Sequence, residues 1–174
     1  GNHTVTINDV KSFSGINIET VLAGYFIFVP VERHQALLDH YKASEAKEMS
    51  TTGGFLYPHV GDVLMELKKT KRLFIVSNCL QGYIENFIRR NHFDSLFDGF
   101  KSSGGTGKPK NDNIRDTIVE YNLCQPIYVG DTAHDEDACK SNNIPFVYAA
   151  YGFGKVTNPK YPIKYFSDLL HIIE

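Results

Sequence analysis

The sequence predicts an α/β protein: a three-layer, Rossmann-like doubly wound parallel sheet with a small helical cap in front of it. Short apolar runs that we interpret as buried strands alternate with segments of helical periodicity through residues 55–174. The strands are expected at residues 72–76, 96–100, 127–129 and 144–149, and the helices at residues 60–69, 81–91, 111–121, 135–142 and 166–173. This alternation is typical of βαβ units, whose strands run parallel.

Residues 1–54 form the predicted cap, because their pattern is mostly helical and provides no partner strand for a sheet. Residues 25–29 are apolar and aromatic, so by pattern alone they could form a strand. Pro30 then favours the first turn of a helix over residues 31–49. The expected apolar stripe of that helix comprises Ala36, Leu37, Tyr41 and Ala43.

The composition argues against several classes of partner. The 174 residues carry a formal net charge of −2 and their basic residues are scattered, so we expect no binding to nucleic acid or to an anionic membrane. No apolar run reaches the roughly 18 residues of a membrane span. The three cysteines are an odd number without CxxC spacing, which favours reduced thiols in a cytoplasmic protein.

The densest group of charged residues follows the strand expected at residues 127–129. Four carboxylates at the end of a buried strand are costly unless a cation lies among them. Because ligands bind at the carboxyl ends of strands in open α/β sheets, we predict a Mg²⁺ site at Asp131 and Asp135 for a phosphorylated small molecule. Ordinary helix capping is the alternative for this pair. Glu136 and Asp137 are interpreted as charges at the helix start.

Two further positions could contact a phosphate group. Ser77 ends a predicted strand and precedes a helix, where it could bind a phosphate oxygen with the neighbouring amides, or simply cap the helix. Lys108 and Lys110 lie in a glycine-rich loop, and either could neutralise a phosphoryl oxygen or be a solvated surface side chain. The loop is not a P-loop, because Pro109 stands where Ser or Thr must bind magnesium.

Three motifs occur in a fixed order: LFIVSN, then GKPK, then GDTAHD followed by DEDACKSNNIPFVYAAYGFG. This set resembles the haloacid dehalogenase (HAD) superfamily of hydrolases, and within it the phosphoglycolate phosphatase branch with a helical cap. The resemblance covers residues 58–174, and residues 5–50 resemble the latter part of the cap. It implies a HAD-like core at residues 55–174 and a partial cap at residues 1–54.

The resemblance also implies roles for the candidate residues. Ser77 would hydrogen-bond the phosphoryl group with help from the backbone of Asn78, and a lysine would stabilise the phosphoryl charge. Lys108 matches the KPxP form of the family motif and Lys110 matches its KxxxI form, so both stay candidates. Asp131 would bind Mg²⁺, and Asp135 would support the ion directly or through water.

One departure from the family pattern is large. The family's nucleophile is the first aspartate of an N-terminal DxDGT motif, which ends the first strand of the sheet, and no such motif occurs here. In the family that strand lies between the strand ending at Ser77 and the strand ending at Asp131, so we expect a central strand to be missing. We therefore expect an upstream segment to supply strand and nucleophile, and this chain alone to be inactive with weak affinity for magnesium.

The expected function is magnesium-dependent hydrolysis of a small phosphomonoester through an aspartyl-phosphate. The substrate would be a small phosphorylated metabolite: phosphoglycolate-like, or a sugar or nucleotide phosphate. The alternative is a non-catalytic relative that binds a phosphorylated ligand or a protein. A mutase stays open, whereas Asp131 and Asp135 argue against a dehalogenase, which needs no magnesium carboxylates. We expect a monomer or a homodimer.

Overall fold

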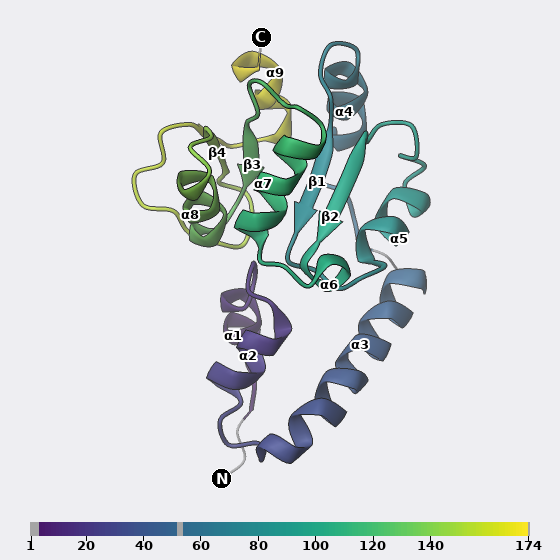
Figure 1. The fold of residues 1–174 in the computed structure, drawn as a ribbon, viewed down its shortest axis with the longest axis vertical. Coiled ribbons are helices and arrows are strands. Elements are labelled where there is room, and N and C mark those ends of the chain that lie inside the picture. The colour runs from purple at the N-terminus through teal and green to yellow at the C-terminus, as the bar shows by residue number, and fades with distance from the viewer. Residues whose placement is uncertain (1–3, 52–53, 174) are drawn as a thin grey trace.

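The computed structural model of the chain describes residues 4–51 and 54–173. Its N-terminal part is helical and lies below the α/β part in Figure 1. This part comprises α1 (Ile7–Ser12), α2 (Ile18–Tyr25), a 3₁₀ turn (Val31–Arg33) and the long helix α3 (His34–Thr51). Thr6 and Asn17 start α1 and α2 because their side chains accept a hydrogen bond from an otherwise unpaired backbone N–H.

Helices and strands alternate through the rest of the chain, as the sequence predicted. The helices are α4 (Val60–Lys68), α5 (Tyr83–Arg90), α6 (Ser103–Thr106), α7 (Lys110–Glu120), α8 (Ala133–Ser141) and α9 (Leu169–Ile172), the last preceded by a 3₁₀ turn (Phe166–Asp168). The strands are β1 (Phe74–Ser77), β2 (Gly99–Ser102), β3 (Tyr128–Gly130), β4 (Phe146–Ala149) and β5 (Pro162–Ile163). The predicted α/β class is therefore confirmed.

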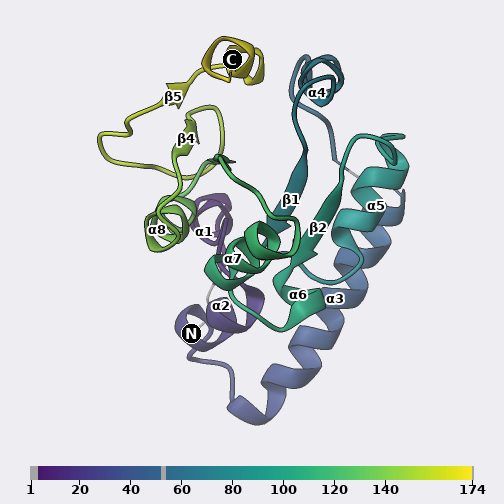
Figure 2. The ribbon, with the colours of Figure 1, turned by 45° about the horizontal axis from the view of Figure 1, so that its top comes forward.

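The described strands form two parallel sheets rather than one. β1 pairs with β2, and the other sheet has the order β3-β4-β5. Figure 2 shows β1 and β2 side by side, apart from β4 and β5. Among the described residues β1 and β3 share no pairing, so the break falls where the missing central strand was expected. The Tyr128 hydroxyl reaches across from β3 and donates to the Val76 carbonyl at 2.7 Å. One buried side chain thus connects the two sheets.

Two apolar clusters pack on the sheets, and α4 contributes to both. Val63 and Leu67 of α4 pack with buried residues of β4, β5 and α9. Leu64, on another face of the same helix, packs with Ile84 and Ile88 of α5. The arrangement follows the helical period of 3.6 residues, which places residues 63, 64 and 67 toward the interior.

The structure corrects two expectations for the helical part. Residues 26–29 form a turn closed by a hydrogen bond from the Val29 N–H to the Phe26 carbonyl, so the strand suggested by their apolar pattern is absent. The predicted apolar stripe of α3 is also wrong, because Leu38 is the only buried residue described on this helix. The side chains that follow it on the same face are Lys42, Glu45 and Met49, all half-buried.

Two further differences concern the α/β part and its border. α6 lies inside the segment expected to be a glycine-rich loop, and β5 was not predicted. β5 has two residues, which is too short for a periodic pattern. The predicted boundary between residues 54 and 55 adjoins residues 52–53, which lie outside the described ranges, so that division stays a prediction.

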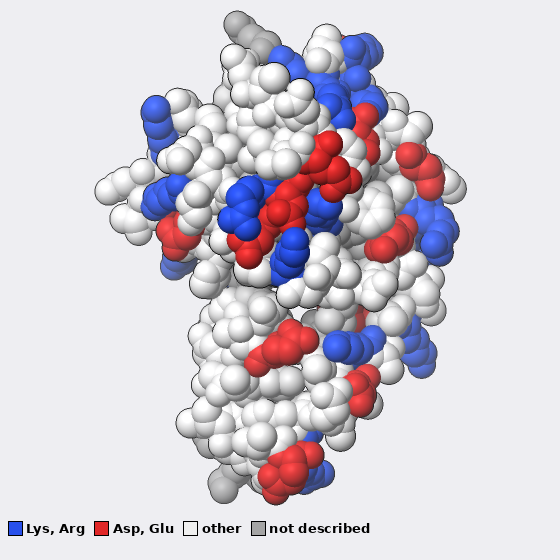
Figure 3. All heavy atoms as spheres, in the orientation of Figure 1, with Lys and Arg blue, Asp and Glu red and all other residues white. Residues whose placement is uncertain are grey.

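The surface and the cysteines agree with the composition. Acidic and basic side chains lie next to one another on the face shown in Figure 3, rather than gathering in a patch of one sign. Across residues 4–51 and 54–173, no helix is long and apolar enough to cross a membrane. Cys79, Cys124 and Cys139 are all free thiols.

Candidate active site

The predicted site residues lie at the carboxyl ends of β1 and β3. β1 ends at Ser77, whose hydroxyl accepts a hydrogen bond from the Cys79 N–H at 3.2 Å and so fixes the turn that follows. β3 ends at Gly130, and Asp131 follows directly. The turn at Gly15 lies against both Asn78, which follows β1, and Thr132, which follows β3, so these two ends share one edge of the fold, where α/β proteins bind ligands.

Lys110 and Asp135 form a buried ion pair at this edge. Lys110 begins α7 and Asp135 lies in the first turn of α8, and their Nζ and Oδ1 atoms are 2.5 Å apart. The two side chains are only 10% and 4% exposed. The Lys110 ammonium also lies 5.8 Å from the centre of the Tyr128 ring, the same side chain that reaches Val76 of β1.

Asp135 also holds the start of α8 in place. Its Oδ2 atom accepts hydrogen bonds from the Asp131 N–H at 3.1 Å, the Thr132 N–H at 3.0 Å and the Thr132 hydroxyl at 2.8 Å. The Thr132 hydroxyl oxygen in turn accepts a hydrogen bond from the Asp135 N–H, which completes a capping box. Burial opposes ionisation of this carboxyl, but Lys110 and Thr132 outweigh it and lower the pKa of Asp135.

Asp131 is held by a different segment, the loop after β4. Its Oδ2 atom accepts hydrogen bonds from the Phe153 N–H at 2.7 Å and the Gly154 N–H at 3.4 Å. The loop approaches so closely that a Cβ atom on Gly152 would lie 2.3 Å from the Cβ of Asp131. Glycine at position 152 is therefore needed for this contact.

The described residues do not assemble a magnesium site by themselves. Both carboxylate oxygens of Asp135 already have partners, and so does one oxygen of Asp131. Residues 4–51 and 54–173 contain no group of three or more His, Cys, Asp or Glu side chains that could hold a metal ion. The predicted ligand role of Asp131 and Asp135 thus stays a prediction, and any complete site needs oxygens from elsewhere.

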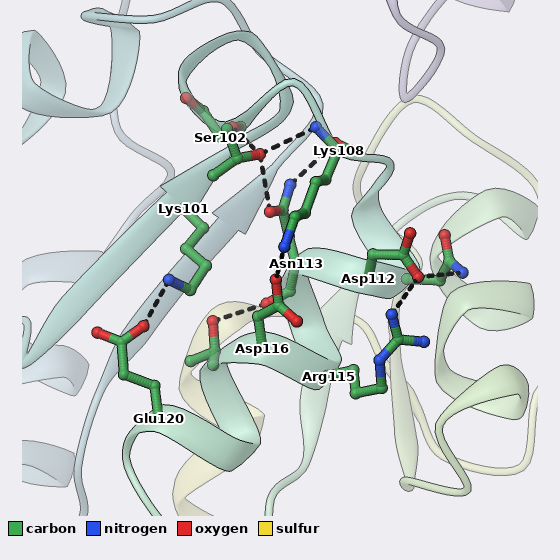
Figure 4. Close-up of polar contacts among 11 residues, drawn as sticks. Lys101, Ser102, Lys108, Asp112, Asn113, Arg115, Asp116 and Glu120 are labelled. Atoms are coloured by element: carbon green, nitrogen blue, oxygen red, sulfur yellow. Dashed lines mark hydrogen bonds and ion pairs between the residues drawn. The ribbon is translucent and has the colours of Figure 1, made fainter.

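The two candidate lysines lie in different environments. Lys108 is 55% exposed and its ammonium binds the Asp116 carboxylate at 2.6 Å (Figure 4), away from Asp135. The loop around it is fixed by the fully buried Asn113, which donates to the Lys108 carbonyl at 3.0 Å and accepts from the Thr106 hydroxyl at 2.8 Å. Of the two lysines, only Lys110 is brought to the carboxyl end of β3.

The remaining carboxylates of the dense group lie outside the pair. Glu136 and Asp137 both lie within ion-pair distance of Lys140, at 2.8 and 3.6 Å. They therefore balance a charge on their own helix, in keeping with their interpretation as helix-start charges.

Two thiols near the site are poor candidates for a nucleophile. Burial raises the pKa of the Cys79 thiol, and burial raises the pKa of Cys139 to about 12. Both therefore stay protonated at neutral pH, whereas the reactive form of cysteine is the thiolate.

The helical part contacts the site through Gly15, in the turn between α1 and α2. The Gly15 carbonyl accepts a hydrogen bond from the Asn78 side chain at 2.8 Å, and Ser103 donates to the other end of that amide at 2.8 Å. A Cβ atom on Gly15 would lie 2.9 Å from the Thr132 hydroxyl oxygen. The turn between α1 and α2 thus touches residues that follow both β1 and β3.

We expect Gly15→Ala to lower the free energy of unfolding by about 1–2 kcal/mol, because Gly15 has a φ of +81°, which alanine adopts only with strain. The added methyl group would also crowd Thr132. Urea denaturation measures the change. Gly24→Ala is the matched control: Gly24 lies in α2 with open space around it, so alanine should stabilise the chain by about 0.5–1 kcal/mol. Equal effects of the two substitutions would contradict the prediction.

Comparison with known proteins identifies the family. A family model described as haloacid dehalogenase-like hydrolase matches residues 1–149. The chain belongs to this family. The predicted HAD resemblance is therefore confirmed. None of the curated proteins matches the chain.

Solved structures of HAD proteins share the fold. A haloacid dehalogenase-like hydrolase from Streptococcus pneumoniae is 20% identical with a TM-score of 0.85, covering 99% of this chain and 83% of its own. A predicted phosphoglycolate phosphatase from Haemophilus somnus is 17% identical with a TM-score of 0.84, covering 98% and 84%. Protein Tyrosine Kinase A of Mycobacterium tuberculosis is 16% identical with a TM-score of 0.78, covering 99% and 83%. At such identities the likeness shows the fold alone, and these names differ in the reaction they state.

Proposed function

We propose that this HAD-family chain carries the phosphate-binding half of a magnesium-dependent phosphomonoester hydrolase that acts on a small phosphorylated metabolite. The observation that supports the proposal is the buried Lys110–Asp135 ion pair at the carboxyl end of β3. A buried ammonium beside a ligand-binding edge can neutralise charge that develops on a transferring phosphoryl group, and electrostatic stabilisation of this kind is the main requirement of phosphoryl transfer.

Each residue has a role in this proposal. Lys110 neutralises phosphoryl oxygens, and Asp135 holds the lysine and the start of α8 in position. Ser77 and the Asn78 N–H donate to the phosphoryl group from the end of β1. Lys108 has no phosphate role in this proposal, because its ammonium binds Asp116 at the surface, away from Asp135 and the carboxyl end of β3.

The nucleophile lies outside the described residues in this proposal. An aspartate from an upstream segment attacks phosphorus, the P–O bond to the organic part breaks, and the alcohol leaves with a proton from the second aspartate of the DxDGT motif. Water then hydrolyses the aspartyl-phosphate and releases inorganic phosphate. The strand that carries this motif fills the break between β1 and β3. Magnesium would supply further neutralisation of phosphoryl charge. Asp131 would contribute one oxygen to the ion, with the others from the upstream segment, water and phosphate. Cytoplasmic location and a monomeric or homodimeric state stay predictions.

Titration calorimetry with inorganic phosphate tests the phosphate site. Lys110→Met should weaken binding about tenfold or more, because hydrogen bonds to charged groups contribute about 1.5–3 kcal/mol. Lys108→Met, the matched control, should leave the dissociation constant unchanged, since Lys108 pairs with Asp116. Circular dichroism confirms that both variants fold. Equal effects of the two substitutions, or none, would refute the assignment of Lys110.

A second measurement tests the missing nucleophile. Residues 1–174 alone should show no magnesium-dependent turnover of a generic phosphomonoester and only weak magnesium binding. The chain extended by its upstream coding sequence should show turnover. Turnover by residues 1–174, or tight stoichiometric magnesium binding, would contradict the proposal. Phosphate binding without turnover in the extended chain would favour the non-catalytic alternative.

A further inference from the structure

A cavity of about 660 Å³ lies between the helical part and the α/β part. Its wall includes Lys42 and Glu45 from the half-buried face of α3, and Tyr83 and Asn86 from the start of α5. The face of α3 that lines the cavity is not the apolar one that the sequence predicted. It carries two charged side chains, Lys42 and Glu45, which face the α/β part. A helix that turns polar side chains toward its neighbour leaves room that packing does not fill.

The cavity reaches the end of β1 where a phosphate is proposed to bind. Asn78 lines it and directly follows Ser77, and Pro109 lines it and directly precedes Lys110. Ser77 and Lys110 themselves do not line the cavity, but their chain neighbours do, so a phosphoryl group bound by these two residues would have its organic substituent next to this space. This inference rests on the proposed function, because it takes the phosphate position from it.

The volume is large for a two-carbon substituent. Pockets that bury whole small-molecule ligands measure about 300–1,000 Å³, and this cavity falls within that range. A glycolate unit would fill a small part of it and leave most of the polar wall without a partner. The size therefore favours a larger organic group than that of phosphoglycolate.

The charges of the wall also disfavour a carboxylate substituent. Lys42 lies 4.0 Å from the Glu19 carboxylate, and Lys108 binds Asp116 at 2.6 Å. Both lysines that line the cavity thus already have acidic partners, and Glu45 adds a negative charge to the wall. A second anionic group on the ligand would meet no unpaired cation among these lining residues.

The polar groups that remain suit hydroxyl groups. Gln81 and Asn86 line the cavity, and a carboxamide donates through its nitrogen and accepts through its oxygen, whereas the Asn78 carboxamide already pairs with Gly15 and Ser103. The Glu45 carboxylate accepts from the Tyr41 hydroxyl at 2.8 Å through one oxygen, and its other oxygen can accept from a ligand. Hydroxyl groups both donate and accept, so several of them on one neutral ligand can pair with this wall.

We infer that the cavity binds the polyhydroxylated part of a phosphorylated sugar or sugar alcohol, and that Glu45 and Asn86 determine this preference. Glucose 6-phosphate, phosphoglycolate, inorganic phosphate and unphosphorylated glucose are the probes, and titration calorimetry on residues 1–174 measures each dissociation constant. Glucose 6-phosphate should bind about tenfold more tightly than inorganic phosphate or phosphoglycolate, the gain of one or two net hydrogen bonds.

Matched variants on α3 and α5 test the role of the cavity separately from that of the phosphate position. Glu45→Ala should weaken glucose 6-phosphate about fivefold to tenfold and leave inorganic phosphate unchanged, since one net hydrogen bond is worth about 1 kcal/mol. Asn86→Ala should act in the same way. Glu48→Ala, three residues further along the same helix and exposed, should change neither constant.

Each outcome has a distinct meaning. Equal affinities for glucose 6-phosphate, phosphoglycolate and inorganic phosphate would overturn the sugar assignment and leave the proposed function standing. Tighter binding of phosphoglycolate would overturn it as well. Failure of inorganic phosphate to bind, with glucose and glucose 6-phosphate binding equally, would refute the proposed function, because the phosphate would then contribute nothing.

Discussion

Asp135→Asn is expected to lower the free energy of unfolding by about 3–5 kcal/mol, the largest effect of any single charge removal at the site. The substitution leaves the Lys110 ammonium buried without a carboxylate, while the asparagine oxygen can still accept the N–H bonds that start α8. The loss is therefore that of the ion pair rather than of the helix cap. Urea denaturation at pH 7, with the slope compared between variants, measures it.

Asp116→Asn is the matched control, because it removes the carboxylate partner of a lysine at the surface. The Lys108–Asp116 pair is 55% and 32% exposed, so its removal should cost no more than about 1 kcal/mol. The double variant Lys110→Met/Asp135→Asn should recover part of the loss, since no unpaired charge stays buried. An Asp135→Asn variant as stable as Asp116→Asn would show that Lys110 finds water or another partner.

The effect of Asp135→Asn should depend on pH in a defined direction. Although burial opposes the ionised form, Lys110 and Thr132 lower the pKa of the Asp135 carboxyl in the folded chain. A lowered pKa stabilises the fold above the unfolded-state pKa of about 3.9, and this contribution is lost as the pH falls through the folded-state pKa. The difference between wild type and variant should therefore hold between about pH 5 and 8 and shrink below about pH 4.

Tyr128→Phe is expected to lower the free energy of unfolding by about 1–3 kcal/mol, because the Val76 carbonyl would lose its hydrogen bond across the break between the sheets. Burial raises the pKa of the Tyr128 hydroxyl well above its usual value, so the hydroxyl stays protonated and donates at any ordinary pH. Urea denaturation again measures the change. Tyr161→Phe is the control, since Tyr161 is partly exposed and its hydroxyl has no described hydrogen-bond partner.

The result distinguishes two views of the break. A loss in Tyr128→Phe alone means that the Tyr128 hydroxyl connects the two sheets in this chain. No loss would mean that water or a further segment reaches the Val76 carbonyl in solution. The second outcome would agree with a chain whose upstream segment occupies the break.

The order of elements in the α/β part could be predicted because helices and strands each bury one face, and the apolar residues of that face recur at a spacing typical of the element. The helix predicted over residues 111–121 is α7, and the strand predicted over residues 127–129 is β3, each shifted by one residue. α3 could not be predicted in the same way. Its one described buried side chain, Leu38, is followed on the same face by Lys42 and Glu45, and a cavity rather than a core explains them.

The sequence indicated where the candidate residues lie along the fold but not which side chains they contact, and their roles stay predictions. Ser77 ends β1, Asp131 follows β3 and Asp135 lies in the first turn of α8. Lys110 begins α7, which follows β2 and α6. The choice between Lys108 and Lys110 depends on which ammonium reaches Asp135, a contact across 25 residues that local pattern does not encode. Helix capping, the alternative given for Asp135, accounts for the donors on its Oδ2 atom, whereas the Lys110 contact on Oδ1 was not predicted.

Three contributors were not predicted as part of the site. Asn113 is fully buried on α7. A polar residue on the buried face of a helix interrupts the apolar pattern, but the pattern alone does not show which groups that residue binds. Tyr128 was counted among the apolar residues of a strand, so its hydroxyl was overlooked. Gly15 could not be recognised from the residue pattern, because its positive φ and its close approach to Thr132 are visible only in the structure.

The divided sheet also bears on self-association. An unpaired strand edge is a template for backbone pairing with another chain, which is the usual route to edge-to-edge aggregation. β1 and β3 are only four and three residues long, the Tyr128 hydroxyl occupies one carbonyl of β1, and the Gly15 turn contacts residues just beyond both strands. Short length and local cover thus protect two edges that would otherwise recruit a second molecule.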